Sequence, residues 1–129
     1  MSPNLQAIME RLDRFSSVLP ALVSGIGRED SLWRPDDRTW SILEIACHLA
    51  DEEARDFRPR LERTIATPQK PFDPIDPQGW AVSRNYREAD IEDATARFVA
   101  ERHRSVMWLM GLGKVDWNRS HVQPQLGTI

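Results

Sequence analysis

Apolar residues recur at the three- and four-residue spacing of an amphipathic helix in three stretches of the chain. The stretches run from about Asn4 to Gly25, from Ser41 to about Thr67, and from Asp90 to Gly111. Their apolar positions include Leu5, Ile8, Leu12, Phe15, Leu19, Ile42, Ala46, Leu49, Phe57, Leu61, Ile91, Ala94, Phe98, Val106 and Leu109. No segment alternates apolar and polar residues as a half-buried strand does. The pattern therefore predicts an all-α protein.

The start of the second helix is marked by the sequence itself. Ser41 and Glu44 have the spacing of a capping box, in which the serine hydroxyl and the glutamate carboxylate each accept a backbone N–H of the other residue. Trp40 and Ile45 stand at the two positions of a hydrophobic staple. We therefore expect this helix to begin at Ser41.

A proline-rich segment separates the second and third helices. Its prolines are Pro68, Pro71, Pro74 and Pro77. Prolines at this spacing keep a chain extended, and about two dozen residues can cross the length of a bundle. We therefore expect the third helix to run parallel to the second, with Trp80 and Tyr86 attaching the crossover to the bundle.

Composition excludes several classes of protein. The 129 residues are the size of a single domain, which we assign to 1–129, and the 17 basic and 20 acidic side chains lack the basic excess of a nucleic-acid binder. The single cysteine, Cys47, excludes an internal disulfide. The longest apolar run, 106–110, is far below the roughly 20 residues of a membrane span. We expect a cytoplasmic protein that binds neither membranes nor nucleic acid.

The last three residues have the pattern of a helix start, and we expect the helix itself to follow beyond residue 129. Gly127, Thr128 and Ile129 have the order of a loop, an N-cap and a first apolar residue. Three amphipathic helices without a fourth leave an apolar groove open, and such surfaces associate. We expect either a fragment, which we favour, or a homo-oligomer such as a dimer that completes its bundle with a partner.

His48 is the first candidate for chemistry. Its neighbours one helical turn away include Glu44, Asp51 and Glu52, and it lies away from the centre of the apolar side. One interpretation is a solvated acidic strip that happens to contain a histidine. The other is a metal ligand, with Glu52 as an accessory ligand or as an acceptor that orients the imidazole.

The remaining reactive side chains favour structural interpretations. His103 lies between two arginines and is expected on the surface, whereas His121, in the loop near the end, is a weaker accessory candidate for the metal. Cys47 points about 100° away from His48 around the helix, so we expect a buried thiol and not a nucleophile. Glu53 and Asp56 face the apolar side and need arginine partners, for which Arg102 is available, although a polar active-site wall stays open as the alternative.

The sequence resembles the DinB/YfiT-like family. The resemblance is carried by the segment from Trp40 to Glu53, by the proline-rich crossover with Trp80 and Tyr86, and by Asp116-Trp117 before His121. It implies a four-helix bundle of up-down-down-up type. It also implies a divalent metal, zinc or nickel, held by three histidines, of which one matches His48. The other two are expected in a His-x-x-x-His pattern on the fourth helix, beyond residue 129.

Three classes of function follow. A metal with an open coordination position lowers the pKa of a bound thiol or water, and the resemblance implies a thiol S-transferase or a hydrolase that acts on a small-molecule thiol or electrophile. The second class is a metal-binding protein without turnover. The third is a helical interaction module that completes its bundle through oligomerisation.

Overall fold

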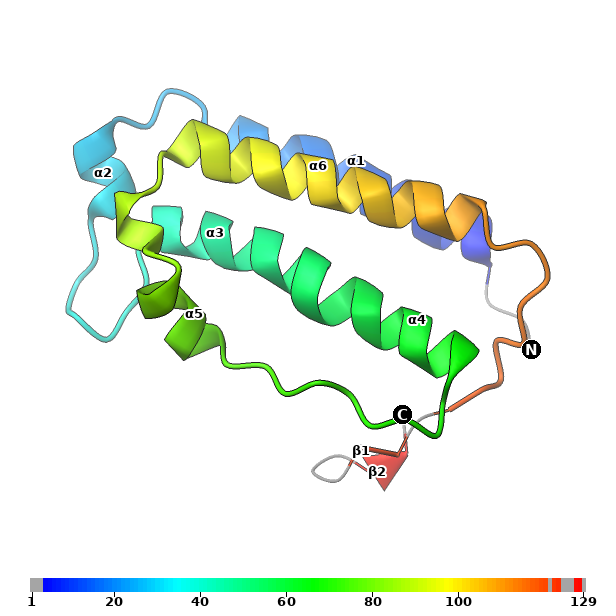
Figure 1. Cartoon of the computed structure of the whole chain (residues 1–129). Helices are drawn as coiled ribbons and strands as arrows, with labels where there is room; N and C mark the ends of the chain where they lie inside the picture. Colours follow the sequence, from blue (N-terminus) through cyan, green and yellow to red (C-terminus); the bar gives the residue numbers. More distant parts are fainter. Residues whose placement is uncertain (1–3, 121, 124–126, 129) are drawn as a thin grey trace.

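Three long helical segments lie side by side and form the body of the molecule (Figure 1). The computed structural model describes residues 4–120, 122–123 and 127–128. The long segments are α1 (Leu5–Val23), the continuous helix made of α3 (Ile42–Glu52), η1 (Glu53–Phe57) and α4 (Arg58–Ala66), and α6 (Ile91–Met110). The short elements are α2 (Arg28–Leu32), α5 (Pro77–Ser83), η2 (Tyr86–Glu88), β1 (Val122–Gln123) and β2 (Gly127–Thr128). The predicted all-α class and the three long helices are confirmed.

The core lies where α6 packs against both α1 and α3. Its buried residues come from all three helices and from η2: Leu19, Val23, Leu43, Ala46, Cys47, Ala50, Tyr86, Ile91, Ala94 and Phe98. The ring of Phe15 on α1 meets that of Phe98 edge to face, with centroids 5.8 Å apart. The amphipathic faces recognised in the sequence therefore converge on one core.

The capping box at the start of α3 is present as predicted. The Glu44 N–H donates to Ser41 Oγ over 3.2 Å, and the Ser41 N–H donates to Glu44 Oε1 over 3.2 Å. Both side chains are buried. The helix that carries His48 consequently begins at a defined position.

Replacing Ser41 with alanine should lower the free energy of unfolding by about 1 kcal/mol, because the Glu44 N–H loses its acceptor in a buried setting. Chemical denaturation measures the change. Ser17→Ala, at an exposed position of α1, is the matched control and should change stability by less than about 0.5 kcal/mol. An unchanged midpoint for Ser41→Ala would show that the cap does not stabilise the helix.

The crossover brings α6 parallel to the α3–η1–α4 helix, as its length predicts. After α4 the chain runs back along the bundle to α5 and η2, so that both helices start at the same end (Figure 1). Tyr86 is buried and Trp80 packs against the core, which confirms their attaching role. The sequence analysis missed α5, although Asp76 accepts the Gly79 N–H as its N-cap and Pro77 occupies the first turn, where proline is favourable.

The second helix changes from α to π geometry at Glu53–Phe57. The Arg58 N–H donates to the carbonyl of Glu53, five residues back instead of four. Pro59 follows directly; it has no N–H for the carbonyl of Arg55, and its ring would clash with that carbonyl in a regular α-helix. The wider turn relieves this clash. It was not anticipated from the sequence, although Pro59 was its visible signal.

The predicted helix start at the end of the chain stays a prediction, because its first helical residue, Ile129, lies outside the described residues. Gly127 and Thr128 form strand β2, and Thr128 pairs with Val122 across an antiparallel ladder. Between Gly111 and Ser120 there is no further helix. In the part of the chain that is described, no helix has the length and apolar character needed to cross a membrane.

Candidate metal centre

His48 lies in the middle of α3 and is held by its neighbours on two sides. Its ring packs against that of Trp40, with centroids 4.7 Å apart and planes tilted by 51°. Its Nε2 lies 3.7 Å from Glu52 Oε1, and its side chain is 22% exposed. Its Nδ1 is buried and has no hydrogen-bond partner. The imidazole is therefore oriented but has an unsatisfied nitrogen.

Burial lowers the pKa of His48 below its usual value, although Asp51 and Asp56 act in the opposite direction by favouring the charged ring. The neutral imidazole is the form that binds a metal ion. His48 is thus in the protonation state of a ligand at neutral pH.

A second carboxylate, that of Asp56, lies beside Glu52 on the same helix. Burial, a hydrogen bond to Asp56 and repulsion by that carboxylate together raise the pKa of Glu52 to about 7, against the opposing effect of Arg60. Asp56 in turn forms an ion pair with Arg60. Glu52 is therefore partly protonated near neutral pH. Glu52 and Asp56 also line a cavity of about 460 Å³ whose apolar walls include Phe57 and Leu61.

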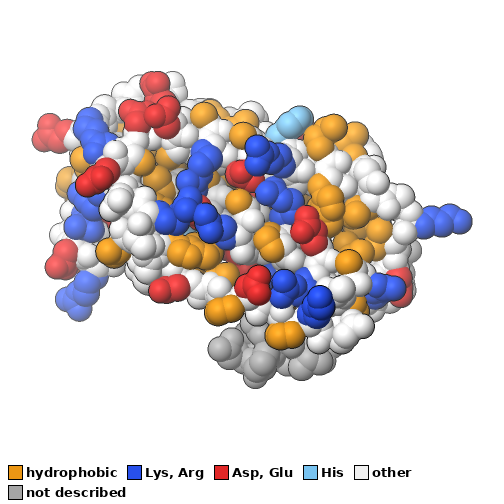
Figure 2. All heavy atoms as spheres, viewed as in Figure 1, with side chains coloured by type: hydrophobic (Ala, Val, Ile, Leu, Met, Phe, Trp, Pro, Cys, Tyr) orange, Lys and Arg blue, Asp and Glu red, His pale blue; other side chains and the backbone are white. Residues whose placement is uncertain are grey.

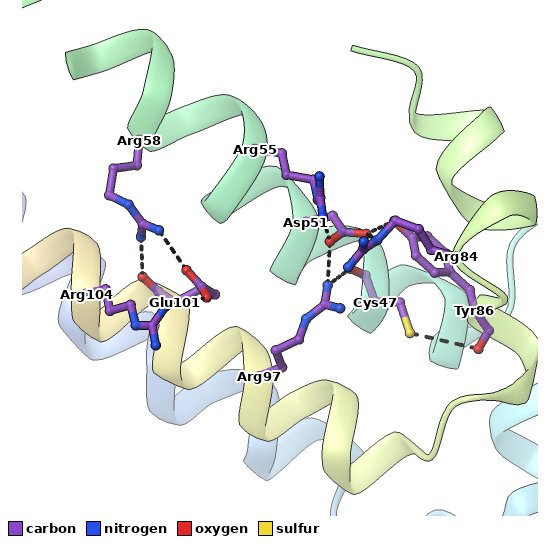
Figure 3. Close-up of polar contacts among 9 residues, drawn as sticks. All are labelled: Cys47, Asp51, Arg55, Arg58, Arg84, Tyr86, Arg97, Glu101 and Arg104. Carbon is purple, nitrogen blue, oxygen red and sulfur yellow. Dashed lines mark hydrogen bonds and ion pairs between the residues drawn. The ribbon is translucent and has the colours of Figure 1, made fainter. Parts of the chain in front are cut away.

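Asp51 belongs to a structural centre instead of the candidate site (Figure 3). It is 1% exposed and accepts hydrogen bonds from Arg97 (2.7 Å), Arg84 (2.8 Å) and the hydroxyl of Tyr86 (2.5 Å). Arg55 lies 3.5 Å from its Oδ1. Burial raises the pKa of Asp51, but the hydrogen bond from Tyr86 and the arginine charges outweigh it and the net pKa is lowered. The sequence analysis identified neither this role nor its partners.

The interpretation of His48 as part of a solvated acidic strip is wrong. Glu44 is buried and accepts a hydrogen bond from Arg87 over 2.9 Å, while Arg34 lies 3.6 Å away. Asp51 is buried as well, and His48 itself is largely covered. The sequence indicated this burial through its high content of arginine, because arginines supply the partners of these buried carboxylates.

The expected ion pairs on the apolar side of the helix are confirmed. Arg102 Nε lies 3.0 Å from Glu53 Oε1, and its guanidinium also lies over the rings of Phe15 and Phe98. Asp56 takes Arg60 as its partner. The ion pair between Glu53 and Arg102 thus attaches the π-helical turn to α6.

The other reactive side chains lie where the structural interpretations placed them. Cys47 is buried against the carbonyl of Tyr86, and burial raises the pKa of its thiol, so it is not an activated nucleophile. His103 is exposed on α6. His121 lies outside the described residues. Among the residues that are described, no group of three or more His, Cys, Asp and Glu side chains is placed to hold a metal ion.

Comparison with known proteins assigns the family. The sequence model of the DinB superfamily matches residues 11–128. The chain belongs to the DinB superfamily. No curated protein matches it significantly.

A solved structure confirms the bundle of this DinB-superfamily chain. YfiT from Bacillus subtilis, described as "a probable metal-dependent hydrolase with an unusual four-helix bundle topology", superposes with a TM-score of 0.84 at 18% sequence identity. The match covers 100% of the present chain and 74% of YfiT. The likeness establishes the fold, and the three long helices of the described residues follow that topology.

Proposed function

We propose that this DinB-superfamily chain supplies His48 as a ligand of a divalent metal, zinc or nickel, in an enzyme of the thiol S-transferase or hydrolase class. The observation that carries the proposal is the imidazole of His48, which packs on Trp40 and keeps a buried Nδ1 without a hydrogen-bond partner. An unsatisfied buried nitrogen normally requires an explanation, and metal ligation provides one. The superfamily membership and the description of YfiT support the same assignment.

The described residues fit one part of such a site. They provide one neutral imidazole whose Nδ1 is free to bind the metal, and the carboxylate of Glu52 lies 3.7 Å from the other ring nitrogen, Nε2, where it can orient the ring. Catalytic zinc sites use three protein ligands and one open position. We therefore assign the remaining ligands to residues outside the described part, for which His121 is one accessory candidate.

The surrounding residues determine what the site can do. When bound, a divalent metal with an open position makes a thiol or water acidic enough to act as a nucleophile near neutral pH. Trp40 covers one face of His48 and limits its rotation. The pKa of Glu52 is raised to about 7, so part of its carboxylate is ionised near neutral pH and can accept a proton beside the histidine. The adjoining cavity of about 460 Å³ gives an electrophile room on this side of the helix.

Zinc or nickel should bind the purified chain weakly and with one-to-one stoichiometry, because the single imidazole of His48 is an incomplete ligand set. Isothermal titration of the metal-free protein measures the affinity. His48→Ala should abolish the binding, whereas His103→Ala, which removes an exposed histidine of α6, should leave it unchanged. Equal binding by the wild type and His48→Ala would contradict the proposal.

A second candidate function is a helical interaction module that associates with another copy of itself. A groove of about 610 Å³ between the end of α1 and the first half of α6 is lined by apolar and small residues, among them Val23, Ile26, Ala96 and Val99. Large apolar side chains of α1 are also exposed: Ile8, Phe15, Val18 and Leu22. A continuous apolar surface of this kind favours association.

If this surface mediates association, the molar mass measured by light scattering should rise with concentration toward that of a dimer or a larger oligomer. Leu22→Glu, on the most exposed of these α1 side chains, should shift the equilibrium toward the monomer, since it places a charge on the apolar surface. Val82→Glu is the matched control, because Val82 is equally prominent on α5 but lies outside this surface. A constant monomer mass would exclude the module.

A further inference from the structure

A buried carboxylate, Asp51, and a partly buried one, Glu101, each lie close to more arginines than one negative charge can neutralise (Figure 3). Asp51 has three arginines within 3.5 Å: Arg55, Arg84 and Arg97. Glu101 has two, Arg58 at 2.8 Å and Arg104 at 3.2 Å. We call these five arginines the arginine face.

The carboxylates of Asp51 and Glu101 lie beneath the guanidinium groups of the arginine face. The side chain of Asp51 is 2% exposed and that of Glu101 15%, whereas Arg55, Arg84, Arg97 and Arg104 are between 33% and 70% exposed. Each guanidinium has five N–H donors, and the two carboxylates engage few of them. A molecule approaching from solvent therefore meets guanidinium groups with free donors and a surplus of three positive charges.

This local surplus is opposite in sign to the formal net charge of the whole protein, which is −3. Figure 2 shows Lys and Arg side chains gathered across the middle of the face formed by α6 and the neighbouring helix α3–η1–α4. Guanidinium groups held around one carboxylate repel one another, because like charges a few ångströms apart interact unfavourably even near a protein surface. An added anion would relieve that repulsion.

We propose that the arginine face binds an acidic segment of another protein, a surface rich in Asp and Glu side chains. The inference is independent of the metal site. Arg97 and Arg104 are seven residues apart on α6, so the two clusters are spaced by about 10 Å along the helix. That spacing suits a ligand with several anionic groups in a row and exceeds what a single phosphate or carboxylate can span.

The chemistry of the surroundings favours a protein over the other polyanions. Small-molecule sites are concave, and the cavity that Arg55 lines has a volume of about 20 Å³, too small for an organic ligand. The larger cavities described above are lined by none of the five arginines. Proteins that bind nucleic acid through phosphate contacts are usually basic overall, whereas this chain has a sequence pI of about 5.6. Arginine forks pair well with carboxylates, so short acidic side chains match the free donors.

Fluorescence anisotropy with a labelled decaglutamate peptide tests the proposal. The double variant Arg55→Gln/Arg104→Gln removes two exposed charges and leaves Arg84 and Arg97 on Asp51 and Arg58 on Glu101, so the fold is kept. The matched control Arg11→Gln/Arg14→Gln removes two charges from exposed positions of α1. Thermal unfolding of both variants checks that the bundle is intact.

The wild-type protein should bind the peptide, and binding should weaken as the salt concentration is raised above about 0.15 M. The variant of the arginine face should lose roughly tenfold in affinity, as expected for two exposed ion pairs, while the α1 variant should bind like the wild type. Absence of binding, or equal losses in the two variants, would overturn the proposal. Tighter binding of an oligothymidylate of similar length would overturn the assignment to a protein partner.

Discussion

Asp51→Asn is expected to lower the free energy of unfolding by about 3 kcal/mol, because it removes the charge that holds Arg84 and Arg97 together and serves as acceptor for the Tyr86 hydroxyl. Breaking a buried ion pair from one side costs about 3–5 kcal/mol, and the partial exposure of the arginines places this case at the lower end. Chemical denaturation measures the loss. Asp13→Asn, at an exposed position of α1, is the matched control and should be nearly neutral.

The loss of stability caused by Asp51→Asn is expected to depend on pH. The pKa of Asp51 is lowered in the folded state, so its contribution to stability is complete above the unfolded pKa of about 3.9 and disappears as pH falls through the folded pKa. The difference in stability between the wild type and Asp51→Asn should therefore stay constant near neutral pH and shrink below about pH 4. A difference that grows on acidification would contradict the role of Asp51 as a buried carboxylate.

Trp40→Ala should cost about 2 kcal/mol of stability and should also change His48. The tryptophan ring covers the imidazole and contributes to its burial, which is the main cause of the lowered pKa of His48. Removing the ring should bring that pKa up toward its ordinary value. Titration of the His48 ring protons by NMR, together with chemical denaturation, measures both effects.

Trp33 provides the control for this experiment, because it is 69% exposed and has no ring contact with His48. Trp33→Ala should change stability by less than about 0.5 kcal/mol and leave the titration of His48 unchanged. An unaltered pKa of His48 in Trp40→Ala would show that the tryptophan does not control the histidine.

The starts of the three long helices could be predicted from this sequence because each is marked by local chemistry. Asn4, Ser41 and Asp90 all accept backbone N–H groups of the first turn, as their residue types indicate. The parallel course of α6 followed from the length and prolines of the crossover. These features depend on a few residues that are adjacent in sequence, so the sequence pattern alone predicts them.

The partners of the carboxylates could not be predicted, because they depend on contacts distant in sequence. Asp51 meets Arg84 and Arg97, which lie 33 and 46 residues further along the chain. Helical spacing alone placed Asp51 beside His48 and gave no sign that its side chain turns toward α5 and α6. The π-helical turn was not predicted for a different reason: the apolar spacing of the second helix continues past Pro59 and gives no sign of a change in helical geometry.

Of the candidate site, the sequence predicted only His48 and the residues one helical turn away from it. His48 and Glu52 are neighbours as their spacing requires, with 3.7 Å between Nε2 and Oε1. The contact between Trp40 and His48 was not foreseen, since the sequence pattern assigned Trp40 to a staple with Ile45. The two side chains, eight residues apart in sequence, meet because the ring of Trp40, directly before the N-cap Ser41, reaches His48 along α3.

The most direct test of the metal assignment is a long-range proton–nitrogen NMR spectrum of the histidine side chains during addition of zinc. The chain has three histidines, so each ring gives a separate and assignable pattern. We expect His48 to be neutral at pH 7 and its ring nitrogen signals to shift with added zinc, while those of the exposed His103 stay in place. A protonated His48, or zinc-induced shifts confined to the other histidines, would contradict the account.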